Sequence, residues 1–209
     1  MSGPACFGKE FSVVLVDGCA ALGVPPDWPL AVIALESGFD PTIYHGRNQA
    51  VALDKAPADW REVEGLGVAL PRNCTGASGL WQKMPQRLKR DGKRDLLRLY
   101  CSSVRDPAQQ LREAIRFWGD WAPPGGWKSR EHFYASNLAP AYAKESAEVL
   151  YPAGSAGAKA NLYLDVDQDG SIEMSELGTP LDRAVRQCRT RYECELDAAY
   201  AWGNLRAGV

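Results

Sequence analysis

The N-terminal part of the chain distributes its apolar residues with the period of an α-helix. Residues 11–22 repeat apolar positions at spacings of three and four, which predicts a helix with one apolar face. The next run, 28–37, is apolar on nearly every side, with Asp27 as its expected N-cap and Pro29 in its first turn. A helix that is apolar all round usually lies inside a protein, so we expect helix 28–37 to be buried.

The second half of the chain also carries helical patterns. Asp106, Pro107 and Gln109 fit the N-cap, N1 and N3 positions of a helix over 106–119. Further helices are expected over residues 94–104, 130–138 and 141–150, and a last helix is expected from Thr179 to about Trp202. Residues 40–80 lack a long period, and a minor β element is expected between 40 and 75. The sequence therefore predicts a mainly α-helical protein.

Composition excludes several classes of function. The 209 residues suit one domain, or one domain with a small appendage, and the formal net charge of −2 gives no basic excess for nucleic acid or an anionic membrane. No apolar run approaches the ~18–20 residues of a transmembrane helix. The N-terminus shows no secretory signal, so we expect another route of delivery if the protein acts outside the cytoplasm.

The cysteines do not indicate a zinc site. The chain has six of them without a CxxC pair, and disulfides remain open because the number is even. A chain of this length does not need cross-links, so mostly free, buried thiols are favoured. The six are Cys6, Cys19, Cys74, Cys101, Cys188 and Cys194.

The clearest motif is DVDQDGSIEMSE at 165–176, which matches a twelve-residue calcium loop. Gly170 permits its sharp turn, and Ile172 is the apolar anchor. The expected ligands are Asp165, Asp167, Asp169, Ser171 through its carbonyl, and Glu176, with Glu173 acting through water. This many hard oxygen ligands suit Ca²⁺ better than Mg²⁺. The alternative is a solvated acidic turn.

The ion is expected to be structural rather than regulatory. Sensor loops usually come in pairs between long helices, whereas this loop is single and is followed at once by Gly178 and Pro180. A calcium sensor with a partner-binding groove is further disfavoured by the low number of methionines, three in the chain.

Glu36 is the candidate catalytic acid. It stands in the stretch LESGFD, 35–40, where the apolar run PLAVIAL ends. Partial burial disfavours the carboxylate anion and raises its pKa, which is what a general acid near neutral pH requires. The alternative is a solvated glutamate at a helix end.

Two later stretches strengthen this interpretation: GASGLWQKMP at 76–85 and EHFYASNLAPA at 131–141. Together with Glu36-Ser37, the pattern Gly79-Leu80-Trp81-Gln82 and the pair Tyr134 and Asn137 resemble the goose-type lysozyme and soluble lytic transglycosylase superfamily. The resemblance spans about 25–150, and stand-alone phage members with an Asp-rich calcium loop look most similar.

The resemblance implies a lysozyme-like helical fold. Residues 1–150 would form the transglycosylase core, and 151–209 would hold the calcium loop and a C-terminal helix, packed on the core as one unit. Two features depart from the family pattern. Ser37 and Gly79 are separated by 41 residues, so an insertion at 41–75 is expected to line or cover the cleft. The third motif reads F-Y-A-S-N instead of A-Y-N-x-G.

The resemblance also implies a reaction. Glu36 would act as general acid and base on the β-1,4 bond between N-acetylmuramic acid and N-acetylglucosamine. Substrate binding would fall to Ser37, Gly79, Gln82, Tyr134 and Asn137. Trp81 is expected in the core rather than as a sugar platform.

A lytic transglycosylase is preferred over a hydrolytic muramidase because a hydrolase needs a second carboxylate. None of the candidates has a spacing argument; they are Asp40, Asp54, Asp59, Glu62 and Glu64. A catalytically weak, calcium-stabilised virion protein is a further alternative.

The expected partners are peptidoglycan and phage tail proteins, without nucleic acid or membrane insertion. The expected location is the phage virion, in its tail, with action in the bacterial periplasm and cell wall. The alternative to a virion protein is an endolysin.

Overall fold

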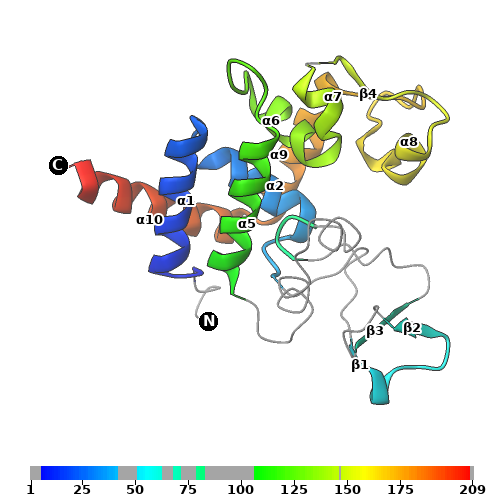
Figure 1. The fold of residues 1–209 in the computed structure, drawn as a ribbon, viewed down its shortest axis with the longest axis horizontal. Coiled ribbons are helices and arrows are strands. Elements are labelled where there is room, and N and C mark those ends of the chain that lie inside the picture. The colour runs from blue at the N-terminus through cyan, green and yellow to red at the C-terminus, as the bar shows by residue number, and fades with distance from the viewer. Residues whose placement is uncertain are drawn as a thin grey trace.

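The computed structural model describes residues 6–41, 51–62, 68–71, 79–82, 106–145 and 147–207. Figure 1 shows that most of this part of the chain is helical, which confirms the predicted mainly α-helical class. Its main helices are α1 (Lys9–Leu22), α2 (Asp27–Ser37), α5 (Pro107–Asp120), α6 (Arg130–Leu138), α9 (Gly178–Gln187) and α10 (Arg189–Ala207).

Helix α1 forms because its apolar stripe meets two other helices. Phe11, Leu15 and Cys19 of this stripe are at most 2% exposed, as the helical period predicts. The helix packs against α5 and α10. A Cβ atom at Gly18 would overlap the side chain of Ile115, so glycine permits the close approach of α1 to α5.

Helix α2 is the buried centre of the molecule, as predicted. Its residues Leu30 to Ile33 are at most 1% exposed, and it contacts α6, α9 and α10. The helix ends at Gly38, whose left-handed backbone (φ +61°) lets its N–H donate to the carbonyl of Ala34. The predicted N-cap was one residue late, because Pro26 holds that position and Asp27 is already helical.

The minor β element expected between 40 and 75 is present. Strands β1 (Val51–Ala52), β2 (Trp60–Glu62) and β3 (Val68–Pro71) form an antiparallel sheet with β3 in the middle. Val51 pairs with Ala69, and Arg61 pairs with Leu70. A 3₁₀ turn, η2 (Leu53–Lys55), follows β1. Figure 1 shows this sheet apart from the helical core.

The helix predicted over 141–150 is wrong in its second half. Helix α7 (Pro140–Lys144) is short, and strand β4 (Val149–Tyr151) pairs antiparallel with β5 (Ile172–Glu173). The partner strand lies inside the acidic loop, so pairing with a distant segment overrides the local helical pattern. Between these strands lie α8 (Ala156–Ala160) and η3 (Leu162–Leu164), and η4 (Met174–Leu177) follows β5.

The single last helix predicted over 179–202 is two helices. Helix α9 begins at Gly178, so Thr179 is inside it rather than its N-cap, and the chain turns at Cys188. The break lets α9 pack on α2 while α10 packs on both α1 and α2. The helix predicted over 94–104 lies outside the described residues.

The N-terminal segment is fastened to α10. Cys6 and Cys194 form a disulfide, so the expectation of mostly free thiols is wrong for this pair, whereas Cys19 and Cys188 are free. Beside it the buried carboxylate of Glu195 accepts from the backbone N–H of Phe7 (2.6 Å) and pairs with Arg191 (3.0 Å).

Among the described residues, no single helix is long and apolar enough to cross a membrane. Helices α1 and α2 meet the length and composition of a span only when added together, and they are bent by 116°.

Candidate active site

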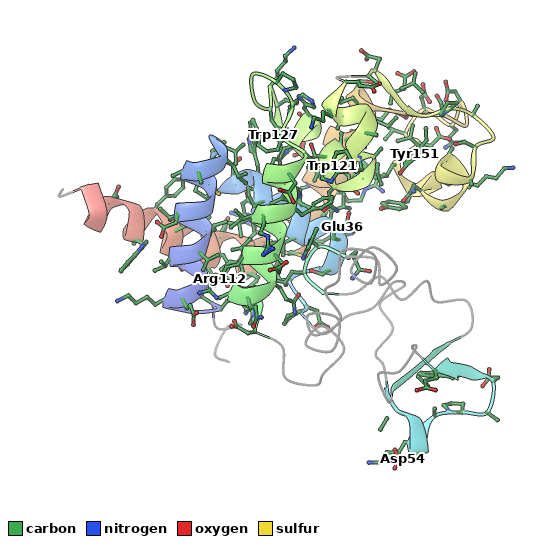
Figure 2. The ribbon with its side chains drawn as sticks, in the orientation of Figure 1. Glu36, Asp54, Arg112, Trp121, Trp127 and Tyr151 are labelled. Carbon is green, nitrogen blue, oxygen red and sulfur yellow. A yellow bond between two sulfur atoms is a disulfide. The ribbon has the colours of Figure 1, made fainter. Side chains whose placement is uncertain are left out.

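Glu36 is held at the C-terminal end of α2, one turn after the most buried part of that helix. Figure 2 shows it in the middle of the molecule, between the core helices and the C-terminal segment that carries Tyr151. The residue is partly buried. Burial raises its pKa from 4.5 to about 7, and the polar side chains of Tyr134 and Asn137 partly offset this rise because they favour the anion.

Helix α6 supplies both of these polar side chains. The helix begins at Ser129, whose hydroxyl caps it by accepting from the N–H of His132 (3.2 Å). Tyr134 and Asn137 are three residues apart and so share one face. The amide nitrogen of Asn137 donates to Glu36 Oε1 (3.1 Å) and lies 3.5 Å from the carbonyl oxygen of Trp81. Asn137 belongs to the third sequence motif, and these two contacts connect it to the first motif, at Glu36, and to the second, at Trp81.

The Tyr134 hydroxyl is fully buried beside the acid. Burial, the charge of Glu36 and the neighbouring Tyr163 raise its pKa well above its usual value. None of its contacts with the described residues meets the geometry of a hydrogen bond. The side chains of Glu36 and Tyr163 are its polar neighbours, so the hydroxyl lies where a ligand beside Glu36 could bond to it.

Residues 79–82 form a tight turn beside the acid. Gly79 (φ +80°) and Gln82 (φ +50°) both have left-handed backbones, and the Gln82 backbone N–H and side-chain amide both donate to the Gly79 carbonyl, at 3.2 and 3.1 Å. Trp81 is 3% exposed and its ring lies 5.1 Å from that of Phe117. Trp81 is therefore a core residue, as predicted, and its carbonyl faces Asn137.

Gln110 of α5 holds this turn in place and was missed by sequence reasoning. It is 1% exposed; its side-chain oxygen accepts from the N–H of Leu80 (2.8 Å), and its side-chain nitrogen donates to the carbonyl of Pro41 (2.9 Å). It thereby joins the turn to the chain leaving α2. The only sequence signal was a glutamine on the otherwise apolar face that carries Leu111 and Ala114.

Tyr163 of η3 is a second residue that sequence reasoning missed. Partial withdrawal from water, followed by the charge of Glu36, raises the pKa of its hydroxyl, although 55% of the residue's surface is exposed. Tyr163 therefore brings the C-terminal segment to the acid. It stands two residues before Asp165, but no motif includes it.

The structure gives Ser37 a different environment from the other predicted substrate contacts. It is 4% exposed, and its hydroxyl donates to the carbonyl of Ile33 (3.0 Å) within α2. Its predicted substrate contact stays a prediction. Gly79, Gln82, Tyr134 and Asn137 all belong to segments that meet at Glu36.

No second carboxylate in the described part of the chain is among the groups that shift the pKa of Glu36. Asp54, Asp59 and Glu62 lie in or between the elements of the small sheet, and Figure 2 shows Asp54 far from Glu36. Glu64 lies outside the described residues. Asp40 remains, four residues after the acid.

The acidic loop lies beyond Tyr163. Ligand oxygens of Asp165, Asp167 and Asp169 lie within 4.8 Å of one another, and Asp165 Oδ1 is buried without a hydrogen-bond partner in the described structure. Asp169 Oδ1 accepts from both the N–H and the hydroxyl of Ser171, at 2.7 and 2.6 Å. This accepting contact lowers the pKa of Asp169.

Glu176 closes the loop from its other end. Its Oε1 accepts from the backbone of Val166 (2.6 Å) and Asp167 (3.2 Å), and its Oε2 accepts from Glu173 (2.8 Å). The structure therefore brings three of the predicted ligands into one cluster, while Glu176 joins the loop ends through hydrogen bonds.

Comparison with known proteins gives one match. Residues 19–120, just under half of the chain, match the family model of the transglycosylase SLT domain. No curated protein and no solved structure matches the chain. The matched range includes Glu36, the 79–82 turn and Gln110, whereas Tyr134, Asn137 and Tyr163 come from the chain that follows it. The match of residues 19–120 to the transglycosylase SLT domain supports the lysozyme-like lytic transglycosylase superfamily for this helical core.

Proposed function

We propose that the protein cleaves the β-1,4 bond between N-acetylmuramic acid and N-acetylglucosamine in peptidoglycan as a lytic transglycosylase. The SLT domain match supports peptidoglycan lytic transglycosylase activity in general. The observation that carries the assignment to named residues is Glu36, whose pKa of about 7 suits an acid that gives and regains a proton near neutral pH.

Glu36 acts twice in this reaction. It first donates its proton to the bridging oxygen, so that the bond from this oxygen to the anomeric carbon breaks and N-acetylglucosamine leaves with its hydroxyl restored. The resulting carboxylate then takes the proton of the muramyl 6-hydroxyl, whose oxygen bonds to the anomeric carbon. The product carries a 1,6-anhydromuramyl end, no water is consumed, and Glu36 regains its proton.

The residues around Glu36 fit these two roles. Asn137 favours the carboxylate through its 3.1 Å hydrogen bond, so it holds the acid in place after the proton has left. The buried hydroxyl of Tyr134 lies beside Glu36 and would bond to the N-acetyl group or the ring of the substrate. No carboxylate of the described residues is among the groups that shift the pKa of Glu36, which favours this intramolecular attack over hydrolysis.

We further propose that the acidic loop binds a structural Ca²⁺. The residues that would hold it are Asp165, Asp167 and Asp169, with the carbonyl of Ser171. The clustered carboxylates repel one another without a cation, and the buried Asp165 Oδ1 lacks a partner among the described residues. When bound, the ion would fix the segment from which Tyr163 reaches the acid.

The location at a phage tail and contact with tail proteins rest on the resemblance to phage members alone. Mass spectrometry of purified virions would test this: peptides of the chain in washed particles support it, and their restriction to the lysate supports the endolysin.

Product analysis tests the reaction. Wild type, Glu36→Gln and Asp40→Asn are incubated with purified peptidoglycan in the presence of calcium, and soluble muropeptides are weighed by mass spectrometry. We expect products lighter by one water than reducing muropeptides, made by wild type and Asp40→Asn but lost in Glu36→Gln. Hydrated ends that disappear in Asp40→Asn would instead establish a muramidase. A wild type that releases nothing beyond Glu36→Gln would favour the virion structural protein.

A further inference from the structure

A pocket is formed between the end of α2, helix α9 and Tyr163 of the C-terminal segment. It has a volume of about 230 Å³ and is bounded by Leu35, Tyr163, Pro180, Arg183, Ala184 and Gln187. Leu35 immediately precedes Glu36, and Tyr163 is close enough to Glu36 to feel its charge. The pocket therefore adjoins the place where the muramyl residue must sit for its 6-hydroxyl to react.

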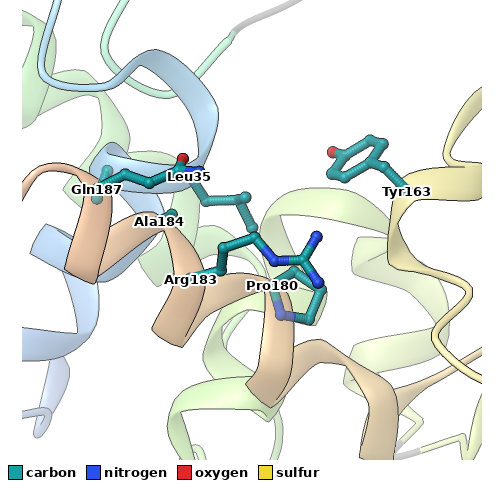
Figure 3. A pocket seen from close by; sticks show the side chains of 7 residues that line it. Leu35, Tyr163, Pro180, Arg183, Ala184 and Gln187 are labelled. Carbon is teal, nitrogen blue, oxygen red and sulfur yellow. The ribbon is translucent and has the colours of Figure 1, made fainter.

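The walls of this pocket combine apolar and polar side chains, and they include one cation. Leu35 of α2 and Pro180 and Ala184 of α9 supply apolar surface. Figure 3 shows the guanidinium of Arg183 beside Pro180, on the side that faces Tyr163. Arg183 and the pocket residues on its side, Tyr163, Pro180, Ala184 and Gln187, all follow the SLT domain match in the sequence.

The guanidinium of Arg183 has no ion-pair partner among the described residues. Its neighbour Asp182 points elsewhere, because it pairs with Arg130 at 2.6 Å. Glu36 does not neutralise it either, since its pKa shift arises from burial, Tyr134 and Asn137. Arg183 is thus a fixed charge that can form two parallel hydrogen bonds with a carboxylate.

The chemistry of peptidoglycan supplies such a carboxylate at the required place. The sugars themselves are uncharged. The acidic groups near the cleaved bond are the carboxylates of the peptide attached to muramic acid or, where the peptide is absent, the free lactyl carboxylate. Because muramic acid carries the attacking 6-hydroxyl, its substituent lies next to Glu36. A pocket below the ~300–1,000 Å³ of whole-ligand sites suits one such substituent.

We propose that Arg183 binds a carboxylate borne by the muramyl residue, so that the C-terminal segment adds a recognition subsite for acidic substituents to the transglycosylase centre. This inference rests on the proposed function, because it takes peptidoglycan as the substrate. It assigns Arg183 to substrate recognition and leaves proton transfer to Glu36. The variant should therefore raise KM and leave the pH profile of kcat in place.

The test compares the kinetics of wild type, Arg183→Gln, Arg183→Lys and the control Arg186→Gln. Arg186 is exposed on the same helix but does not line the pocket. The substrates are peptide-bearing glycan strands and the same strands after an amidase has removed the peptide and left the lactyl carboxylate. The readout is the release of 1,6-anhydromuramyl ends, with the melting temperature of each variant as the check of folding.

We expect Arg183→Gln to raise KM about tenfold on peptide-bearing strands, in line with the loss of one hydrogen bond to a charged group. Arg183→Lys should recover part of this loss, and Arg186→Gln should match wild type. An increase in KM confined to peptide-bearing strands identifies a carboxylate of the peptide, because the lactyl carboxyl is an amide on those strands. An increase that also appears on strands without peptide shows that Arg183 binds the freed lactyl carboxylate as well.

Two results would overturn the proposal. Equal KM values for wild type and Arg183→Gln on both substrates would remove Arg183 from recognition while the transglycosylase activity stands. A wild type that releases no anhydro ends from either substrate would instead overturn the proposed function, and the subsite with it.

Discussion

The amide of Asn137 donates a hydrogen bond of 3.1 Å to the carboxylate of Glu36, across 101 residues of sequence. The donor comes from α6 and the acceptor from the end of α2, two helices that pack together in the core. The contact favours the ionised form of the acid and partly offsets the effect of burial on its pKa. The acid strength of Glu36, the proposed catalytic acid, therefore depends on how α6 packs against α2.

Removing this donor should make Glu36 a weaker acid. For wild type we expect kcat to fall as pH rises through about 7, because the acid must hold its proton at the start of the reaction. In Asn137→Ala the anion loses a donor, so the fall should move to higher pH, with lower kcat at the optimum. The measurement is the pH dependence of anhydromuramyl release, with the exposed Asn204→Ala as control. An alkaline limb that stays in place or moves to lower pH would contradict the role of Asn137.

Gln110 should matter for both folding and activity. In Gln110→Ala the buried N–H of Leu80 and the carbonyl of Pro41 lose their partner, which we expect to cost about 2–3 kcal/mol of unfolding free energy. Because the 79–82 turn then loses its attachment, kcat should also fall. Urea unfolding and product release measure the two effects. Gln109→Ala, on the same helix, is the matched control, and equal stability of the two variants would refute the bridging role.

Calcium should stabilise the protein through the acidic loop. At a concentration a hundred times the dissociation constant, an ion that binds only the folded state adds about 2.7 kcal/mol, or roughly 5–10 °C in a domain of this size. Chelation should remove this gain, and Asp167→Asn should abolish most of it. Asp197→Asn, an exposed acid on α10, should respond to calcium as wild type does. A melting temperature insensitive to both calcium and chelator would exclude the ion.

Reduction should weaken the attachment of the N-terminal segment. The Cys6–Cys194 disulfide closes a loop across 188 residues, and a native disulfide typically contributes about 2–4 kcal/mol. The double variant Cys6→Ser/Cys194→Ser should therefore unfold at lower denaturant, and wild type in dithiothreitol should match it. Buried Cys19, whose pKa burial raises to about 12, should not react with a thiol reagent until the protein unfolds. If dithiothreitol left wild type unchanged while the double variant was destabilised, the loss would come from packing at these positions instead of the bond.

Local patterns predicted the helices that bury a continuous stripe. Helix α5 begins where the Asp106 cap indicated, with its carboxylate accepting from Ala108 at 2.8 Å, and α2 is as buried as its apolar run implied. The end of α2 could be placed because Gly38 adopts the left-handed conformation that a helix stop favours. The position of Glu36 followed from that end.

Contacts between distant segments could not be read in this way. Val149–Tyr151 is a strand because it pairs with the acidic loop. The break at Cys188 lets α9 and α10 pack against different helices, and no local sequence pattern predicts it. Gln110 and Tyr163 are ordinary helix and loop residues in sequence. They reach the site because α5 and η3 are placed there by the tertiary fold, so only the structure identifies them.

Glu36→Gln should stabilise the protein above neutral pH and not below pH 4. Its pKa is 4.5 in the unfolded chain and about 7 in the folded one. Below pH 4.5 Glu36 is protonated in both the folded and the unfolded state, so its burial does not lower the unfolding free energy. As pH rises from 4.5 to 7 the unfolded state ionises first, so unfolding free energy falls, and above 7 the full cost is present. Because Glu36 keeps some contact with water, we expect a gain of about 1–3 kcal/mol for the variant at pH 8.

Urea unfolding of wild type and Glu36→Gln at pH 4 and pH 8 measures this difference. Glu145→Gln, an exposed acid, should show no pH-dependent gain. A stabilisation confined to high pH, combined with lost activity, would mean that the fold sacrifices stability to keep a protonated acid in the site. Equal differences at both pH values would show that the folded protein does not hold the Glu36 proton more tightly than the unfolded chain, and the case for Glu36 as the acid would then lose its electrostatic basis.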